Sequence, residues 1–265
     1  MAYPLPATPD HPDSEALPLY DRVLYKVSGE ALMGERAFGT DPEAVGRIVD
    51  DIIEAKSLGV SLALVVGGGN IFRGAALAAQ GLDRVTGDHM GMLAIVMNAL
   101  VLRMAFEAKG HDAVILSGLA VPQAVETFTQ RGMLEHREAG RIIIFAGGTG
   151  SPYFTSDTGA ALRAAEFGAD VIVKGTQVDG IYTADPKLDP HATRYDTLSH
   201  TDLLERGLRI MDAAAVALAR DNDIDIAVFS IRERGELARV IQGQGRATIV
   251  SREQAVDTTA DAMRA

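Results

Sequence analysis

Residues 61–74 read SLALVVGGGNIFRG, and in this stretch an aliphatic run ends abruptly in three glycines. Three other runs of β-branched and aliphatic residues meet glycine in the same way: 23–27 before Ser28-Gly29, 142–146 before Gly147-Gly148, and 171–173 before Lys174-Gly175. Such runs are typical of strands buried in a parallel sheet. Open α/β sheets bind ligands beyond the carboxyl ends of their strands, and glycine turns there offer bare N–H groups to anions. The pattern therefore predicts parallel strands that end in phosphate-binding turns.

Helical patterns fill the intervals between these runs. Thr40-Asp41-Pro42-Glu43 reads as a capping box ahead of a helix that ends at Gly59. Further helices are predicted near 90–109, 122–131, 156–167, 201–220 (as a pair) and 232–241, and further strands at 113–116, 226–229 and 248–250. Because strand and helix alternate throughout, we predict an α/β protein with a mostly parallel sheet and helices on both faces.

The predicted helix at 90–109 is unusually apolar. Between residues 92 and 106 only Asn98 and Arg103 are strongly polar, and apolar residues go right round the cylinder. Such a helix is either the centre of a large core or part of a subunit interface, and the sequence leaves both open. The chain has no uninterrupted run of 18 apolar residues, so no membrane span is predicted.

Composition narrows the class of protein. A chain of 265 residues can form one large domain or two closely packed lobes, and a net charge of −11 argues against nucleic acid as a partner. The absence of cysteine excludes disulfides and thiolate chemistry and is compatible with a cytoplasmic protein. The six histidines lack metal-ligand spacing, so no metal site built by the protein is predicted. Residues 1–21, with five prolines and no Lys or Arg, are predicted to be a disordered tail, and 252–265 a second tail.

The commonest phosphate-binding motifs are missing from the sequence. It contains no G-x-x-x-x-G-K-[ST], no G-x-G-x-x-G opening a helix after the first strand, and no protein-kinase signature. Lys26, beside the Ser28-Gly29 turn, is either a solvated edge lysine or an ammonium aimed at a phosphoryl group. Gly67-Gly68-Gly69 is either a tight turn or, with Arg73 one helical turn later, an anion site with a guanidinium fork.

Two further segments place polar groups where predicted helices begin. Asp88, within GDHMGM at 87–92, is either a helix N-cap or an acceptor for the hydroxyl groups of a ligand. Thr155-Ser156-Asp157 follows the glycine turn at 147–150 and leads into a helix N-terminus. Backbone N–H groups and the helix dipole make such a terminus favourable for an anion.

Taken together, these motifs resemble those of the bacterial UMP kinases of the amino acid kinase family. The resemblance runs from about Tyr25 to Val250 and rests on KVSGEAL at 26–32, VGGGNIFRG at 66–74, GDHMGM at 87–92, the segment 148–157, and VDGIYTADP at 178–186. The order of GGGNIFRG and GDHMGM favours UMP kinases over relatives that act on aspartate, glutamate, acetylglutamate or carbamate. The resemblance implies a three-layer α/β/α sandwich, with a UMP-binding lobe at 22–168 and an ATP-binding lobe at 169–251.

The resemblance also assigns residues to each ligand. Those implied for UMP are Gly68, Arg73, Asp88, Thr149, Gly150, Ser151, Pro152, Tyr153, Phe154, Thr155 and Ser156, with Asp88 on the ribose hydroxyls. Those implied for ATP are Lys26, Val27, Ser28, Gly29, Gly69, Arg73, Thr176, Tyr182 and Asp185. Asp157 and Asp212 would organise Lys26 and the shell of a Mg²⁺ ion held mainly by the nucleotide phosphates. The implied catalytic residues are thus Lys26, Arg73, Asp157 and Asp212.

The implied reaction transfers the γ-phosphoryl group of ATP to UMP, giving ADP and UDP in pyrimidine nucleotide biosynthesis. The attacking UMP phosphate oxygen is already ionised near neutral pH, so catalysis needs positioning and charge stabilisation rather than a protein base. Two alternatives stay open. One is a non-catalytic anion-binding or storage protein on the same fold, and the other is an amino acid kinase with another acceptor.

Regulation and the number of subunits are implied by the resemblance alone. We expect a homo-oligomer, a hexamer as in bacterial UMP kinases, held in part by the helix at 90–109. Residues 34–39 match a segment that is tied to activation by GTP in some members, and UTP is the corresponding candidate inhibitor. Ser151 stands where the family commonly has Asn, and Met104 and Glu107 differ from residues that shape the GTP site in some members.

Overall fold

The computed structural model describes residues 17–72, 81, 83–208 and 210–252. Its centre is a nine-stranded sheet in the order β4-β3-β5-β2-β1-β6-β10-β11-β9, in which every neighbouring pair is parallel except β10 and β11. The strand bounds are β1 Arg22–Val27, β2 Ser61–Val66, β3 Ala113–Ser117, β4 Glu126–Thr127, β5 Ile142–Ala146, β6 Val171–Thr176, β9 Thr197–Ser199, β10 Asp225–Ser230 and β11 Ala247–Ser251. β7 Ile181–Tyr182 and β8 Arg194–Tyr195 form a separate antiparallel pair.

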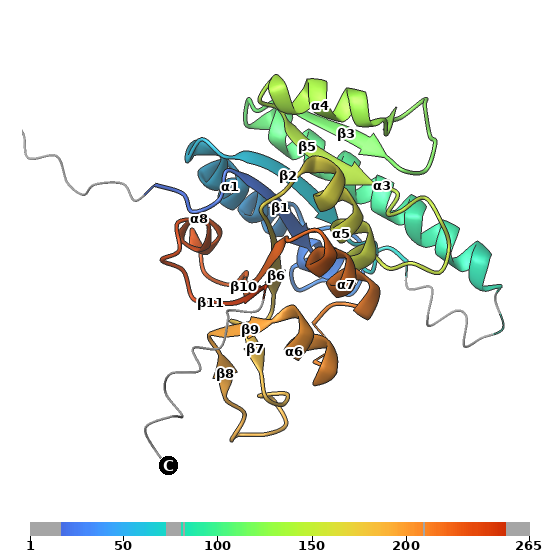
Figure 1. The fold of residues 1–265 in the computed structure, drawn as a ribbon. Helices are drawn as coiled ribbons and strands as arrows, with labels where there is room; N and C mark the ends of the chain where they lie inside the picture. The colour runs from blue at the N-terminus through green and yellow to red at the C-terminus, as the bar shows by residue number, and fades with distance from the viewer. Residues whose placement is uncertain (1–16, 73–80, 82, 209, 253–265) are drawn as a thin grey trace, which may run out of the picture.

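Helices cover both faces of the nine-stranded sheet, and this confirms the predicted α/β/α sandwich (Figure 1). One face carries α1 Pro42–Ser57, α3 Arg84–Ala108 and α8 Glu236–Ile241. The other face carries α4 Gln130–Glu138, α5 Ser156–Phe167, α6 His200–Glu205 and α7 Ala213–Asp221. A short 3-10 helix, η1 Gly29–Met33, directly follows the central strand β1.

The alternation of side chains along β1 decides which residues reach which face. Val23, Tyr25 and Val27 belong to the core under α1, α3 and α8, whereas Leu24 belongs to the core under α5 and α7. Lys26 follows Leu24 by two residues and so points toward α5. β6 pairs with β1 in parallel, so the strands of the two predicted lobes form one continuous sheet.

Four predicted helix starts are wrong. Helix α8 begins at Glu236 rather than at residue 232 and has no side-chain cap, and in the other three cases a different side chain caps the helix. Asp41 rather than Thr40 caps α1, because its carboxylate accepts hydrogen bonds from the N–H groups of Glu43 and Ala44. α3 starts at Arg84 rather than at residue 90, because Asp83 accepts from the N–H of Thr86. Where a helix was predicted at 122–131, residues 126–127 instead pair with β3 at the sheet edge, and Thr129 caps α4 by accepting from the N–H of Gly132.

Helix α3 has one face buried against the sheet and one apolar face left exposed. Ile95, Leu102 and Phe106 are buried against the sheet. The opposite side, which we call the α3 apolar face, consists of Met90, Leu93, Met97 and Met104. By length and composition α3 could cross a membrane, which the sequence analysis did not anticipate, yet 44% of its apolar window is buried within the protein. Its contacts with α1, β3 and β5 are those of a helix that covers a sheet.

Candidate active site

The turns after β1 and β2 lie against each other at the carboxyl edge of the sheet. A Cβ atom added at Gly29 would lie 2.5 Å from both the carbonyl oxygen of Gly67 and Oδ1 of Asn70. Gly68 lies equally close to helix α3, since its added Cβ would be 2.9 Å from the carbonyl oxygen of Gly91. Glycine is required at both positions so that the two predicted phosphate turns can pack on each other and on α3.

A reciprocal pair of buried amides fastens these turns to the middle of α3. Nδ2 of Asn70 donates to Oδ1 of Asn98 at 3.0 Å, and Nδ2 of Asn98 donates back to Oδ1 of Asn70 at 2.7 Å. The same two nitrogens donate to backbone carbonyls, Asn70 to Gly39 at 2.9 Å and Asn98 to Gly67 at 2.7 Å. Buried amides satisfied in this way hold a unique arrangement. The sequence analysis noted Asn98 only as a polar residue in an apolar helix and missed this role.

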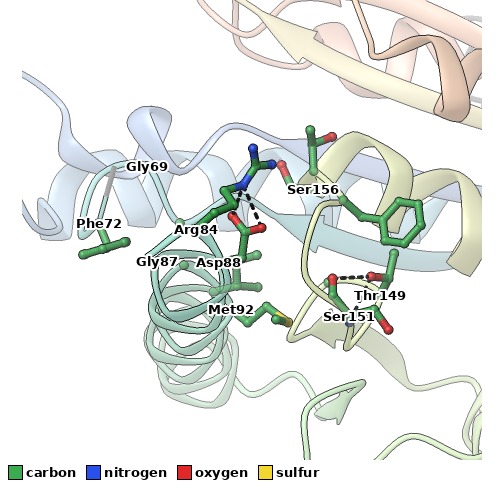
Figure 2. A pocket seen from close by; sticks show the side chains of 15 residues that line it. Gly69, Phe72, Arg84, Gly87, Asp88, Met92, Thr149, Ser151 and Ser156 are labelled. Carbon is green, nitrogen blue, oxygen red and sulfur yellow. Dashed lines mark hydrogen bonds and ion pairs between the residues drawn. The ribbon is translucent and has the colours of Figure 1, made fainter. Parts of the chain in front are cut away.

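A cavity of about 390 Å³ opens between α3 and the loop that joins β5 to α5 (Figure 2). Seven residues implied for UMP line it: Gly68, Asp88, Thr149, Ser151, Phe154, Thr155 and Ser156. Gly150, Pro152 and Tyr153 belong to the same loop but are not among the lining residues. Arg73, implied for both nucleotides, lies outside the residues that the structure describes.

Asp88 lies on the cavity wall and is not a helix cap. Asp83 occupies the N-cap of α3, so the cap interpretation of Asp88 is wrong. The Asp88 carboxylate accepts hydrogen bonds from Nε of Arg84, at 3.1 and 2.9 Å, and from the backbone N–H of Tyr153 at 2.7 Å. The carboxylate therefore joins the first turns of α3 to the loop on the far side of the cavity.

Arg84 supports this connection from the same helix turn. Its guanidinium carbon lies 5.4 Å from the centroid of the Tyr153 ring, in a cation–π contact. Tyr153 has φ 71°, a conformation that is costly for a residue with a side chain, so the loop depends on its partners to keep it. Arg84 was not predicted, because the spacing of four residues between Arg84 and Asp88 indicates an ion pair only on a helix, and the helix was expected to start at residue 90.

The loop on the far side of the cavity is shaped by its own hydroxyl groups. Oγ1 of Thr149 donates to the carbonyl of Ser151 at 3.1 Å and accepts from its N–H at 3.2 Å. Thr155 caps α5 by accepting from the N–H groups of Asp157 and Thr158 at 3.0 and 3.3 Å. Thr155 and Ser156 both line the cavity, so the N-terminal turn of α5 lies at its wall, where an anion would be favoured.

Lys26 is 6% exposed, so its interpretation as a solvated edge lysine is wrong. Its Nζ lies 2.7 Å from Oδ1 of Asp157, in the first turn of α5. Nζ of Lys174 lies 2.9 Å from Oδ2 of the same carboxylate, and it also donates to the carbonyl of Ile210. One carboxylate therefore holds two ammonium groups. From the sequence, Lys174 was identified only as part of the glycine turn after residues 171–173. Its position beside Lys26 was not predicted.

The ionisation of this cluster follows from its burial and its charges. Burial would raise the pKa of Asp157, but the ammonium groups of Lys26 and Lys174 together hold it below its ordinary value. Burial lowers the pKa of Lys174, the charge of Lys26 lowers it further, and Asp157 opposes both effects. With both lysines protonated, the three side chains carry one net positive charge.

Asp212 supports α5 from the neighbouring helix. Its carboxylate caps α7 by accepting from the N–H of Ala215 at 2.9 Å. It also accepts from the hydroxyl groups of Thr155 and of Thr158, the latter at 2.7 Å. In the part of the chain that the structure describes, no hydrogen bond or ion pair joins Asp212 to Lys26, but the charge of Asp212 opposes the lowering of the pKa that burial causes at the neighbouring Lys174.

The remaining residues implied for ATP lie at the carboxyl ends of β1, β2 and β6 and in the segments that follow them. Val27 is buried, Ser28 caps η1 by accepting from the N–H of Glu30, and Gly69 lines the cavity beside Gly68. Three others make hydrogen bonds to near neighbours in their own loops: Thr176 with Val178, Tyr182 with Asp179, and Asp185 with Lys187. The side chains of these three are held by near neighbours, while the backbones of Thr176 and Tyr182 also pair with β10 and β8.

The described residues contain no group of three or more His, Cys, Asp or Glu side chains able to hold a metal ion. Mg²⁺ takes oxygen ligands and is usually bound by one or two carboxylates together with substrate phosphates. Asp157 is already shared by two lysines, whereas the contacts of Asp212 are with hydroxyl and amide groups. Of these two carboxylates, Asp212 is the one that makes no ion pair with a lysine among the described residues.

This site and fold place the chain in a known class of phosphotransferases. The sequence profile of the amino acid kinase family matches residues 21–230, and the chain belongs to that family. It is 59% identical over 234 residues to the uridylate kinase of Brucella anthropi, covering 88% of this chain and 98% of that protein. It is also 59% identical over 236 residues to the uridylate kinase of Rhizobium meliloti, covering 89% and 98%. The solved UMP kinase of Bacillus anthracis is similar with a TM-score of 0.85 at 33% identity, covering 89% of this chain and 97% of that one.

Proposed function

We propose that this chain is a nucleoside monophosphate kinase that transfers the γ-phosphoryl group of ATP to UMP. The observation that carries the proposal is one sheet edge at which a cavity walled by Asp88 adjoins the first turn of α5, where Asp157 holds Lys26. A carboxylate suits ribose hydroxyls, and an ammonium suits a migrating phosphoryl group. Uridylate kinases that match this chain over nearly their whole length support the choice of UMP as acceptor.

In the proposed complex, UMP occupies the cavity with its ribose hydroxyls on Asp88 and its phosphate near Gly68, Arg73 and the N-terminal turn of α5. ATP places its phosphates at the turns after β1 and β2 and the rest of the nucleotide near Thr176, Tyr182 and Asp185. The lobe boundary near residue 168 then separates UMP and the ATP phosphates, in the first lobe, from the rest of the ATP molecule.

The proposed reaction is an in-line displacement. A UMP phosphate oxygen bonds to the γ-phosphorus of ATP, the bond from that phosphorus to the ADP oxygen breaks, and UDP and ADP result. The attacking oxygen is already ionised near neutral pH, so no side chain has to remove a proton. Lys26 and Arg73 stabilise the charge on the transferring group, and Asp157 orients Lys26. Mg²⁺ on the nucleotide would neutralise phosphate charge, with Asp212 as the residue near it.

An acceptor panel tests this function directly. ADP release should be measured with ATP and each of UMP, aspartate, glutamate, acetylglutamate and carbamate. Turnover with UMP alone supports the proposal, and turnover with another member of the panel identifies a different kinase. Binding of UMP and ATP by calorimetry without any ADP release would favour the non-catalytic storage alternative.

We also propose that copies of the chain associate through the α3 apolar face, as part of a hexamer. An exposed row of Met90, Leu93, Met97 and Met104 on one long helix is typical of an interface that a partner covers. Size-exclusion chromatography with light scattering tests association, since a fully active species near 28.1 kDa would contradict it. Cytoplasmic location, activation by GTP and inhibition by UTP belong to the same proposal, and the two effectors can be added to the ADP-release assay.

A further inference from the structure

Strand register brings Lys26 and Lys174 to the same carboxylate. The two residues are paired with each other in the parallel strands β1 and β6. Each follows a residue of the core under α5 by two positions, Leu24 in β1 and Ile172 in β6, so both side chains point toward that helix. Asp157, in the first turn of α5, then receives Lys26 on Oδ1 at 2.7 Å and Lys174 on Oδ2 at 2.9 Å.

Lys26, Lys174 and Asp157 form a cluster with two ammonium groups and one carboxylate. A structural ion pair between β1 and α5 would need only one ammonium group. The side chains of Lys26, Lys174 and Asp157 are only 8%, 11% and 17% exposed. The carboxylate of Asp212 offsets part of the charge of Lys174 but makes no ion pair with either lysine among the described residues. Burying the second ammonium is therefore costly, and a single Lys–Asp pair would join the same elements at a lower cost. The lowered pKa of Lys174 reflects this burial and the neighbouring charge of Lys26. An arriving anion relieves the excess, and the phosphates of a nucleotide are anions of the right kind.

We propose that Lys174 is a positioning residue for phosphoryl transfer, which fixes Asp157 through Oδ2 so that Lys26 keeps its place and its charge for the phosphoryl group. This inference rests on the proposed phosphotransferase function. Lys174 also donates to the carbonyl of Ile210, in the segment that leads to the cap residue Asp212. The ammonium of Lys174 therefore connects β6 to the first turn of α5 and to the segment that precedes α7.

Lys56 provides a matched control within the same chain. It is partly buried, burial lowers its pKa, and its ammonium donates to a backbone carbonyl, that of Val60 at 2.9 Å. It lies in the last turn of α1 and makes no ion pair with a carboxylate among the described residues. Replacing Lys56 therefore removes a similar lysine without touching Asp157.

The test compares Lys174→Met, Lys174→Arg and Lys56→Met in steady-state ADP release with UMP. We expect Lys174→Met to lower kcat by about 10- to 100-fold, the range seen when a group that orients a reacting residue is lost. The KM for UMP should stay near the wild-type value. Lys174→Arg, which keeps the charge, should recover part of kcat, and Lys56→Met should keep all of it. A folded Lys174→Met protein with wild-type kcat would overturn the proposal.

A double-mutant cycle with Asp157→Asn separates positioning from a general loss of stability. Because Lys174 acts through Asp157, the double variant should lose no more kcat than Asp157→Asn alone, whereas independent, additive losses would contradict the proposal. Thermal melts establish how much of each variant is folded. If Lys174→Met does not fold, Lys174→Gln takes its place, since it removes the charge but keeps a donor for Ile210.

The same data keep two failures apart. A wild-type chain that releases no ADP with UMP refutes the proposed function, and the role of Lys174 falls with it. If the wild-type chain is active and the Lys174→Met variant is equally active, only the role of Lys174 is refuted.

Discussion

The two sides of the proposed active site are built by contacts of different range. On the acceptor side, hydrogen bonds join residues far apart in the chain, Tyr153 to Asp88 and Asn70 to Asn98. On the donor side, the side chains of Thr176, Tyr182 and Asp185 bond to residues two or three positions away, although the backbones of Thr176 and Tyr182 pair with the more distant strands β10 and β8. Long-range contacts fix one element against another, whereas local turns fix only their own shape. We therefore expect the side chains of the acceptor pocket to be in place before UMP binds, and those on the donor side to take their final positions when the nucleotide binds.

The largest effect is expected at Lys26, where the two sides meet. Lys26→Ala should lower kcat by roughly 10²–10³, as for loss of one preorganised charge-stabilising group, with little change in UMP affinity. Steady-state ADP release measures the change. Lys109→Ala is the control, because Lys109 forms an exposed ion pair with Asp50 and should keep wild-type kcat. A Lys26→Ala enzyme within about tenfold of wild type would mean that Lys26 is only structural.

Asp88 tests the acceptor side alone. Asp88→Asn should weaken UMP binding by about 1–3 kcal/mol, because the ribose hydroxyls lose one of two acceptor oxygens and the negative charge of the carboxylate, while the KM for ATP stays unchanged. The control is Asp83→Ala, which removes the actual cap of α3 and should lower thermal stability without changing the KM for UMP. Equal increases in both KM values for Asp88→Asn would break the distinction between the two sides.

The amide pair tests whether the acceptor pocket is held by its long-range contacts. Asn98→Asp removes the donor to Gly67 and to Asn70 in a buried place, and should lower the free energy of unfolding by about 1–3 kcal/mol. UMP binding should weaken in the same variant. Asn222→Asp is the control, since Asn222 is exposed and its amide bonds only to the Leu218 carbonyl. Chemical denaturation and UMP calorimetry give both quantities, and an unaltered UMP affinity would contradict the preformed pocket.

The smallest effect is expected on the donor side. Tyr182→Phe removes the hydrogen bond to Asp179, three residues away. The free energy of ATP binding, measured through the KM for ATP, should therefore change by about 1 kcal/mol or less. UMP binding should not respond. An ATP effect as large as that of Asp88→Asn on UMP would show that the donor loop is also fixed before binding, and the contrast between the two sides would fail.

Local sequence features predicted the parts of the fold that depend on local interactions. The β-branched runs became strands, and the glycine turns lie together at the sheet edge because parallel strands share that edge. Errors arose where two polar residues competed for one role. Thr40 and Asp41 both suit the N-cap of α1, and Asp41 occupies it. Asp83 occupies the N-cap of α3, and it was not considered as a cap because the helix was predicted to start at residue 90.

The candidate site was predicted where motifs carry it and missed where strand register or helix packing carries it. The resemblance to UMP kinases supplied Lys26, Asp88 and Asp157, whose motifs are contiguous. Lys174 becomes part of the site only through its pairing with Lys26 across β1 and β6. Asn98 matters because α3 lies over the turn after β2, which no periodicity in the helix reveals.

The α3 apolar face has a consequence for the response of the protein to temperature. Burial of apolar surface between two protein surfaces has a negative heat-capacity change, and near room temperature its driving force is mainly entropic. Contacts of this kind weaken on cooling. If copies of the chain meet through Met90, Leu93, Met97 and Met104, as proposed, the assembly should dissociate in the cold and re-form on warming, while the hydrogen-bonded pocket within each copy stays intact.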